Sequence, residues 1–206
     1  HNDHNYFEIA HTMRRLQGLC HDTRLYNFSD NHDVERLPNK LRNREHIRHI
    51  ALLVYTLWGI PSIYYGSEFG IEGKKEWGSD WPLRPCLDLA DFKDAESTNP
   101  VTSVYAALGR LKAAEPALTW GEFKELHLTT QCYAYARVLD GEALVAVLNN
   151  GDTPAQLEFQ LPVEASAAED LLADTVGAQP VMTSFDWGRM KVQLPSNYAT
   201  LLRLKK

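Results

Sequence analysis

Cysteine is scarce in this chain of 206 residues, and the few cysteines are scattered. Cys20, Cys86 and Cys132 lie far apart, are odd in number and form no C-x-x-C spacing. This pattern predicts neither a disulfide framework nor a zinc site. Because reduced thiols fit a reducing compartment, we expect a cytoplasmic location.

Long apolar runs and an excess of basic residues are also missing. A membrane helix needs about 20 apolar residues, and the mildly apolar stretch 52–58 is far shorter. The chain has 21 Lys and Arg against 27 Asp and Glu, a formal charge of −6. Since nucleic-acid binding relies on clustered Lys and Arg, we expect neither a nucleic-acid nor a membrane partner. The 44% of hydrophobic residues is typical of a globular protein with a buried core.

A polar cluster directly after a short apolar run is the most informative feature that is present. Leu25, Tyr26 and Phe28 lead into Ser29-Asp30-Asn31-His32-Asp33, as expected where a buried strand delivers side chains at its carboxyl end. Residues 59–68 repeat this design, and a helical pattern separates the two runs. The spacing is typical of one parallel β–α–β unit.

Three helices are predicted before residue 118. The first covers about residues 6–18 with an amphipathic pattern. The second follows Asn43 as a candidate N-cap and ends before Gly59, with packing as the expected role of His46 and His49. The third begins at Asn99-Pro100 and runs to about residue 115. The start, residues 1–4, contains two histidines that could be read as metal ligands. We prefer a solvated chain start and assign no metal.

From about residue 118 the pattern changes from helical to twofold. Cys132 to Leu139 and Glu142 to Asn149 are joined by Asp140-Gly141, a strong two-residue hairpin signal. Further strands are expected at 157–161, 191–194 and 198–204. Several short antiparallel strands are typical of a small β-sandwich.

Together, the two motifs, His32-Asp33 and Ile63 to Glu68, resemble the α-amylase family of glycoside hydrolases. The run from Ser67 to Lys75, followed by Asp80 and Leu83-Arg84-Pro85, is most similar to its neopullulanase and cyclomaltodextrinase branch. The resemblance implies an α/β part followed by an all-β part. Residues 1–117 would be the last part of a TIM (β/α)8 barrel, from helix six to helix eight, and residues 118–206 a C-terminal antiparallel β-sandwich.

The resemblance also implies site residues. Asp33 would be the transition-state stabiliser, His32 would contact the same sugar, and Asn31 and Arg36 would contribute to substrate binding. The family's aspartate nucleophile and glutamate acid/base precede these positions, and no segment here reproduces either motif. We therefore expect a C-terminal part of a larger retaining hydrolase or transglycosylase, acting on α-glucan oligosaccharides without a cofactor. By itself the chain is expected to be inactive and to self-associate.

Simpler interpretations stand beside these. Asp30, Asn31 and Asp33 could serve turn chemistry; we favour function for His32 and Asp33 and structure for Asp30 and Glu35. Loop anchoring is at least as plausible as substrate contact for Tyr65 and Glu68. Trp77 and Trp81 could stack on sugar rings, although loop packing is more frequent. The rival overall interpretation is a non-catalytic carbohydrate-binding or structural module.

Overall fold

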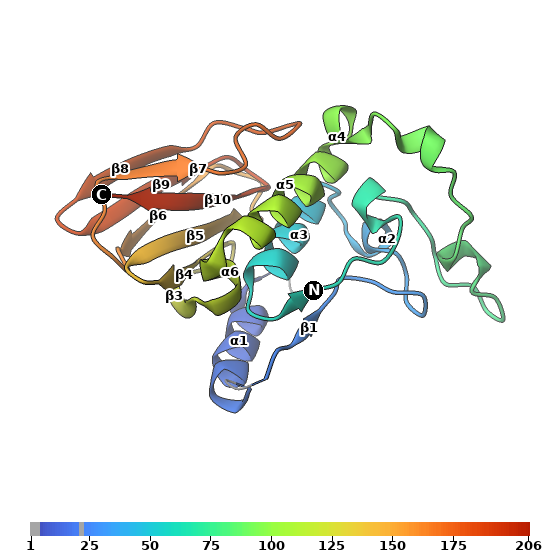
Figure 1. Cartoon of the computed structure of the whole chain (residues 1–206), viewed down its shortest axis with the longest axis horizontal. Coiled ribbons are helices and arrows are strands. Elements are labelled where there is room, and N and C mark those ends of the chain that lie inside the picture. Colours follow the sequence, from blue (N-terminus) through green and yellow to red (C-terminus); the bar gives the residue numbers. More distant parts are fainter. Residues whose placement is uncertain (1–4, 21–22) are drawn as a thin grey trace.

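A computed structural model describes residues 5–20 and 23–206. Its first part is built of helices, short 3-10 turns and two very short strands (Figure 1). The elements are α1 Phe7–Leu19, β1 Tyr26–Asn27, α2 Leu37–Lys40, α3 His46–Thr56, β2 Ile60–Pro61, η1 Ser67–Phe69, η2 Trp81–Leu83, η3 Leu89–Phe92, α4 Ala95–Thr98, α5 Pro100–Ala114 and α6 Pro116–Trp120. No helix among the described residues is long and apolar enough to cross a membrane.

The predicted parallel unit is confirmed. β1 and β2 pair in parallel, with Tyr26 opposite Ile60, and α3 connects them. The backbone N–H of Ser62 donates to the carbonyl of Asn27 at 2.7 Å. Gly59, at φ 122°, has to be glycine here, because a Cβ would lie 2.5 Å from the carbonyl oxygen of Leu25. Residues 63–68 therefore follow β2 and turn into η1 instead of forming the strand itself.

The helix predictions hold with small shifts. The side chain of Asn99 accepts a hydrogen bond from the N–H of Val101 at 2.8 Å, and Pro100 is the first residue of α5. Asn43 is not the N-cap of α3, which begins at His46 with Glu45 as its N-cap. It lies two residues earlier, where its Oδ1 accepts from the N–H of Glu45.

The second part consists of antiparallel strands, namely β3 Glu122–Leu128, β4 Cys132–Leu139, β5 Glu142–Asn149, β6 Ala155–Gln160, β7 Ala167–Asp170, β8 Met182–Asp186, β9 Arg189–Leu194 and β10 Tyr198–Lys205. In the described part of the chain they form one sheet of order β3-β4-β5-β10-β7 and another of order β6-β9-β8. The β4–β5 hairpin has the predicted bounds, with Asp140 and Gly141 both at positive φ as a type I′ turn requires. An α/β part followed by antiparallel sheets is thus confirmed.

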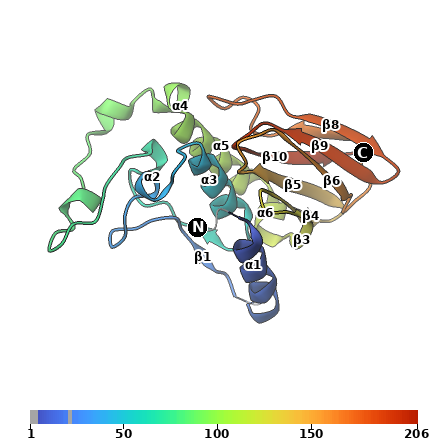
Figure 2. The same ribbon diagram turned by 180° about the vertical axis from the view of Figure 1, so that it is seen from behind.

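The five-stranded sheet is buried on both faces. Tyr133 and Tyr135 of β4 pack with α3, α5 and α6, whereas Ala134 and Ala136 face the three-stranded sheet. The helices accordingly lie between the sheets and the long loops that follow β1 and β2 (Figures 1 and 2). The predicted boundary between residues 117 and 118 falls within α6, so one core spans both sides of it.

Candidate active site

Asp30 anchors the loop that follows β1. Its side chain is buried, and its Oδ2 accepts a hydrogen bond from the N–H of Leu37 at 3.0 Å. Its Oδ1 accepts from the hydroxyl of Ser67 at 2.8 Å, which joins this loop to the one after β2. With both oxygens occupied by the protein, Asp30 has the structural role expected for it.

Asn31 turns the next two side chains outward. Its Oδ1 accepts from the N–H of Asp33 at 2.8 Å, an Asx turn. As a result the side chains of His32 and Asp33 are 53% and 62% exposed, and His32 Nε2 lies 3.3 Å from Asp33 Oδ2. The carboxylate of Asp33 is thus available to a ligand, whereas the amide oxygen of Asn31 is used within its own loop.

Arg36 is completely buried and bonded to the protein. One guanidinium nitrogen donates to the carbonyl of Tyr65 at 2.8 Å, and the other donates to that of Leu83 at 2.9 Å. The group also lies 4.1 Å from the ring centre of Tyr64. The residue ties three loop segments together. Its predicted contribution to substrate binding stays a prediction.

Tyr64 contributes a neutral hydroxyl near His32. The two ring centres are 6.3 Å apart. Desolvation raises the pKa of Tyr64, with the neighbouring Tyr65 adding to the effect. Tyr64 therefore stays protonated and offers both a hydrogen-bond donor and an acceptor at the edge of the site.

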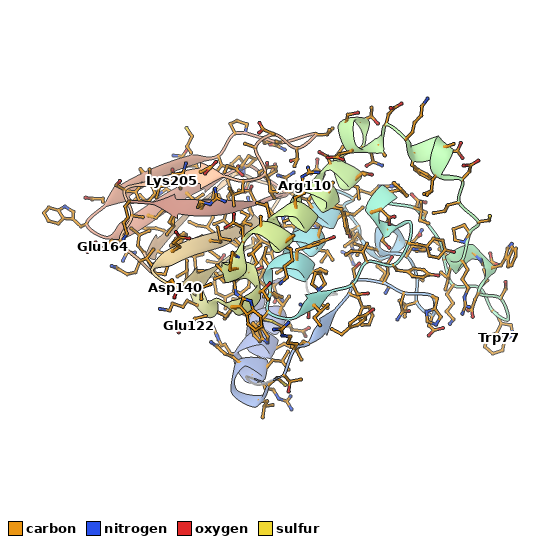
Figure 3. All side chains as sticks on the ribbon, viewed as in Figure 1. Trp77, Arg110, Glu122, Asp140, Glu164 and Lys205 are labelled. Atoms are coloured by element: carbon orange, nitrogen blue, oxygen red, sulfur yellow. The ribbon has the colours of Figure 1, made fainter. Side chains whose placement is uncertain are left out.

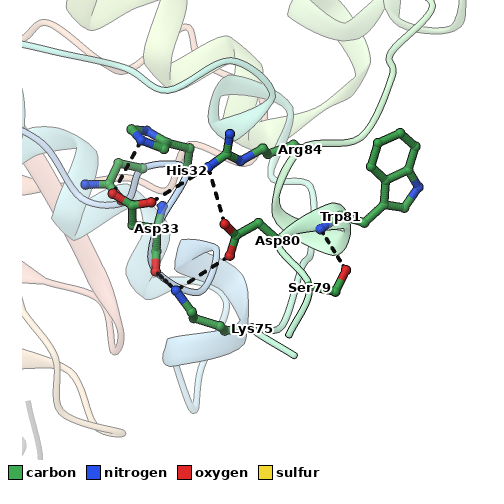
Figure 4. A network of polar contacts seen from close by, with 8 residues as sticks. His32, Asp33, Lys75, Ser79, Asp80, Trp81 and Arg84 are labelled. Atoms are coloured by element: carbon green, nitrogen blue, oxygen red, sulfur yellow. Dashed lines mark hydrogen bonds and ion pairs between the residues drawn. The ribbon is translucent and has the colours of Figure 1, made fainter. Parts of the chain in front are cut away.

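A ring of charges connects Asp33 to the loop after β2, as Figure 4 shows. Arg84 Nη2 lies 3.8 Å from Asp33 Oδ1 and 3.4 Å from Asp80 Oδ2. Lys75 closes the ring, since its Nζ donates to the backbone carbonyl of Asp33 at 2.8 Å and lies 3.6 Å from Asp80 Oδ1. Each exposed pair contributes little alone, but the shared members hold this loop beside Asp33.

Lys75, Asp80 and Arg84 belong to the segments that carry the family resemblance, but their pairing with one another was not predicted. The spacing of Asp80 and Arg84, four residues apart, was the available signal. Tyr65 anchors its loop, since its hydroxyl donates to the carbonyl of Pro85 at 2.9 Å. The backbone carbonyl of Glu68 accepts from the hydroxyl of Thr102 at 2.8 Å, whereas Oε2 of its side chain is buried without a hydrogen-bond partner.

No group of three or more His, Cys, Asp or Glu side chains is arranged to hold a metal within residues 5–20 and 23–206. His1 to His4 lie outside the described residues. The site as described offers an exposed carboxylate, an imidazole and neighbouring cations, all of which can hydrogen-bond sugar hydroxyls.

The family model of the α-amylase catalytic domain matches residues 3–133. The chain belongs to the α-amylase family. This match covers both motifs that carried the resemblance and reaches into β4, so the family predicted from the sequence is confirmed.

Individual relatives agree with this assignment. A cyclomaltodextrinase of Bacillus sp. is 31% identical over 129 residues, which are 61% of this chain and 22% of the relative. Neopullulanase 2 of Thermoactinomyces vulgaris is 29% identical over 141 residues, which are 67% of this chain and 23% of the relative. The chain therefore spans less than a quarter of the length of these two curated relatives.

A solved structure is similar over the entire chain. The crystal structure of a cyclomaltodextrin glucanotransferase with a three-domain ABC distribution superposes with a TM-score of 0.82, covering 100% of this chain and 41% of the other, at 20% identity. At that identity the likeness establishes the fold alone. The α/β part and the sheets after it thus have a common arrangement in the two proteins.

Proposed function

We propose that this chain forms the C-terminal part of a retaining α-glucan hydrolase or transglycosylase. Residues 1–117 would complete its (β/α)8 barrel, and residues 118–206 would be its C-terminal β-sandwich. In this proposal Asp33 stabilises the transition state, and the nucleophile and the acid/base come from elsewhere in the enzyme. The substrates are oligosaccharides derived from starch.

The exposed carboxylate of Asp33 at the end of β1 is the observation that carries the proposal. Two other carboxylates near it are less accessible: Asp30 is buried and caps its own loop, and the side chain of Asp80 is 42% exposed against 62% for Asp33. The anomeric carbon becomes cation-like during glycoside cleavage, and hydrogen bonds to ring hydroxyls that strengthen in that state lower the barrier. Asp33 and His32 are placed to accept and donate such bonds.

Asn31 and Arg36 have supporting roles in this proposal. Asn31 holds the turn that exposes Asp33, and Arg36 holds the loops around it. A retaining mechanism also needs a nucleophile and an acid/base about 5 Å apart. Because Asp33 supplies electrostatics without bond-making, the chain by itself should release no glucose or maltose from a maltooligosaccharide.

The test replaces Asp33 by Asn in the complete enzyme that carries this segment. Loss of a contact made only in the transition state should lower kcat and kcat/KM together, by about 10²-fold or more. Glu35→Gln, in the same loop, is the matched control and should retain activity. Near-normal turnover of Asp33→Asn on a maltooligosaccharide would exclude the assigned role.

A further inference from the structure

A hollow of about 210 Å³ lies where the helices meet the sheets. Its walls come from the first turns of α3 and α5, from residues 176–179 of the loop between β7 and β8, and from residues 197–198, where β10 begins. In Figure 1 the loop between β7 and β8 reaches across towards α4 and α5. No residue of the candidate active site lines this hollow, so it needs an explanation of its own.

The greater part of the wall is apolar. Ile47 and Ala51 of α3, Val104 of α5 and Val176 of the loop contribute to it. Apolar hollows with a few polar groups, placed where two parts of a fold meet, are typical ligand sites. Pockets for drug-sized ligands measure roughly 300–1,000 Å³, so the occupant of this one would be smaller.

Arg48 forms the polar end of the hollow. Its Nε donates to the carbonyl of Ala199 at 2.6 Å, its Nη1 donates to the hydroxyl of Thr175 at 3.0 Å, and its Nη2 donates to the hydroxyl of Tyr198 at 2.9 Å. A guanidinium has five N–H donors, so these three bonds leave two unused. All three acceptors are uncharged.

The charge of Arg48 also lacks the partner that neighbouring arginines have. Arg44 pairs with Glu72, and Arg110, labelled in Figure 3, pairs with Glu96 at 2.7 Å. Arg48 makes no such ion pair with any residue that the structure describes. Asp170 attracts it without contact, since its Oδ1 is bonded within its own segment and to β10. Desolvation accordingly lowers the pKa of Arg48, as expected for a charge that is incompletely compensated.

Tyr198 adds a further donor beside Arg48. Its side chain is buried, and its hydroxyl oxygen accepts from Arg48 and from the N–H of Gln179 at 3.1 Å. Burial raises the pKa of Tyr198, so the hydroxyl keeps its proton, and none of the described residues accepts it. The polar end of the hollow thus combines a cation without an anion and donors without acceptors.

We propose that this hollow binds a small monocarboxylic acid with a compact apolar body, separately from the candidate active site. A carboxylate is an acceptor only and can receive several N–H and O–H bonds at once, so it suits both Arg48 and Tyr198. Water would accept the same bonds, but it would neither neutralise Arg48 nor pack against the apolar wall. Glu45 also lines the hollow, and its charge disfavours an acid with a second carboxylate.

Benzoate and 3-methylbutanoate are the probes, titrated into the full chain by calorimetry. Their uncharged amides have the same apolar bodies, whereas sulfate has negative charge and no apolar body. Both acids should bind at millimolar concentration or below, and the amides should bind roughly tenfold more weakly, because they forgo the bonds between charged groups. Sulfate should not displace the acids.

Two variants and a control locate the bound acid. Val176→Phe fills the hollow and leaves Arg48 unchanged, so it should remove binding of both acids. Arg48→Lys should weaken binding roughly tenfold, because an ammonium lacks the planar fork of a guanidinium. Arg110→Lys, at an exposed position outside the hollow, is the matched control and should bind as the unaltered chain does. Circular dichroism should show that all variants fold.

Several results would overturn the proposal. One is the absence of binding by both acids at millimolar concentration, and another is equal binding of the amides, since Arg48 would then not select a charge. Unchanged binding in Val176→Phe would place the acids elsewhere, even if Arg48→Lys fails to fold. Displacement of the acids by sulfate would show a general anion site in place of a site for carboxylic acids. Asp33→Asn should bind both acids normally, so failure of the proposed function would leave this site standing.

Discussion

Buried polar side chains hold the helices and the five-stranded sheet together. Arg137 of β4 is buried and donates to the carbonyls of Thr56 at 3.2 Å and Gly121 at 2.8 Å. Burial lowers the pKa of its guanidinium to about 10, still far above neutral pH, so it remains charged. His49 of α3 makes an equivalent contact, with Nε2 3.0 Å from the carbonyl oxygen of Asn149. These contacts have partners far away in the sequence, and the sequence pattern could not reveal them.

His49 should make the fold sensitive to acid. Desolvation, and to a lesser degree His46 and Arg48, lowers its pKa from 6.5 to about 4. On acidification the unfolded chain is protonated first, so stability is lost as the pH falls from about 6.5 towards 4 and levels off below that. The shift corresponds to about 3 kcal/mol.

The measurement is urea unfolding at a series of pH values, for the unaltered chain and for His49→Gln. The loss of stability between pH 6.5 and 4 should be smaller in the variant. His11→Gln, at an exposed position of α1, is the control and should follow the unaltered chain. Identical pH dependence in all three proteins would show that His49 does not titrate in this range.

At the scale of elements, the sequence predicted those turns and helix ends whose geometry depends on a few adjacent residues. The Asp140-Gly141 turn and the Asn99-Pro100 helix start were readable because turn and cap geometries depend on a few adjacent residues. β4 and β5 were predicted from the turn that joins them, since nearly every residue of both strands is buried and they show no alternation. A sheet covered on both faces loses the alternation of apolar and polar residues. The helical cover of this sheet was accordingly not foreseen.

In the candidate site, too, positions set by adjacent residues were predictable, and contacts with distant residues were not. The position of His32 and Asp33 at the end of β1 was readable because they follow a strand directly, and both side chains are exposed there. The burial of Arg36 was not, because its acceptors are carbonyls of Tyr65 and Leu83 and any residue can supply a carbonyl.

Residues 118–206, produced without the residues before them, should still fold and should unfold cooperatively. Apolar residues of both sheets, among them Val145, Phe159 and Val192, form a core that needs no helix. Without the helices, however, Tyr133 and Tyr135 become exposed, and the contacts of Arg137 to Thr56 and of His49 to Asn149 are lost. We therefore expect a lower melting temperature for the segment than for the corresponding transition of the full chain.

Circular dichroism and a dye that binds exposed apolar surface test this expectation. The segment should show a sigmoidal melt and bind more dye than the full chain does. Tyr133→Ser with Tyr135→Ser should reduce the dye signal, because these side chains lie on the exposed face. A gradual, non-cooperative melt would show that the boundary at residue 118 is wrong.

At the scale of the whole molecule, β1 and β2 form a two-stranded sheet with exposed apolar side chains beside it. Within the described residues these strands pair only with each other, so both outer edges keep free backbone donors and acceptors. Tyr26, Phe28 and Ile60 beside them are 66%, 49% and 49% exposed. Open strand edges next to apolar side chains readily pair with another chain, and a second copy offers a self-complementary surface.

We therefore expect the chain alone to form dimers or larger oligomers at micromolar concentration. Light scattering measures this directly, and Phe28→Ser with Ile60→Ser should shift the mass towards the monomer because these substitutions make the exposed edge polar. Met182→Ser is the control, since Met182 is 62% exposed but lies on β8 in the other part of the molecule. A monomer at all concentrations would contradict the expectation, as would an oligomer that persists unchanged in the double variant. In the proposed complete enzyme, further barrel strands would pair with the edges of β1 and β2 within one molecule. The association should therefore disappear in that enzyme.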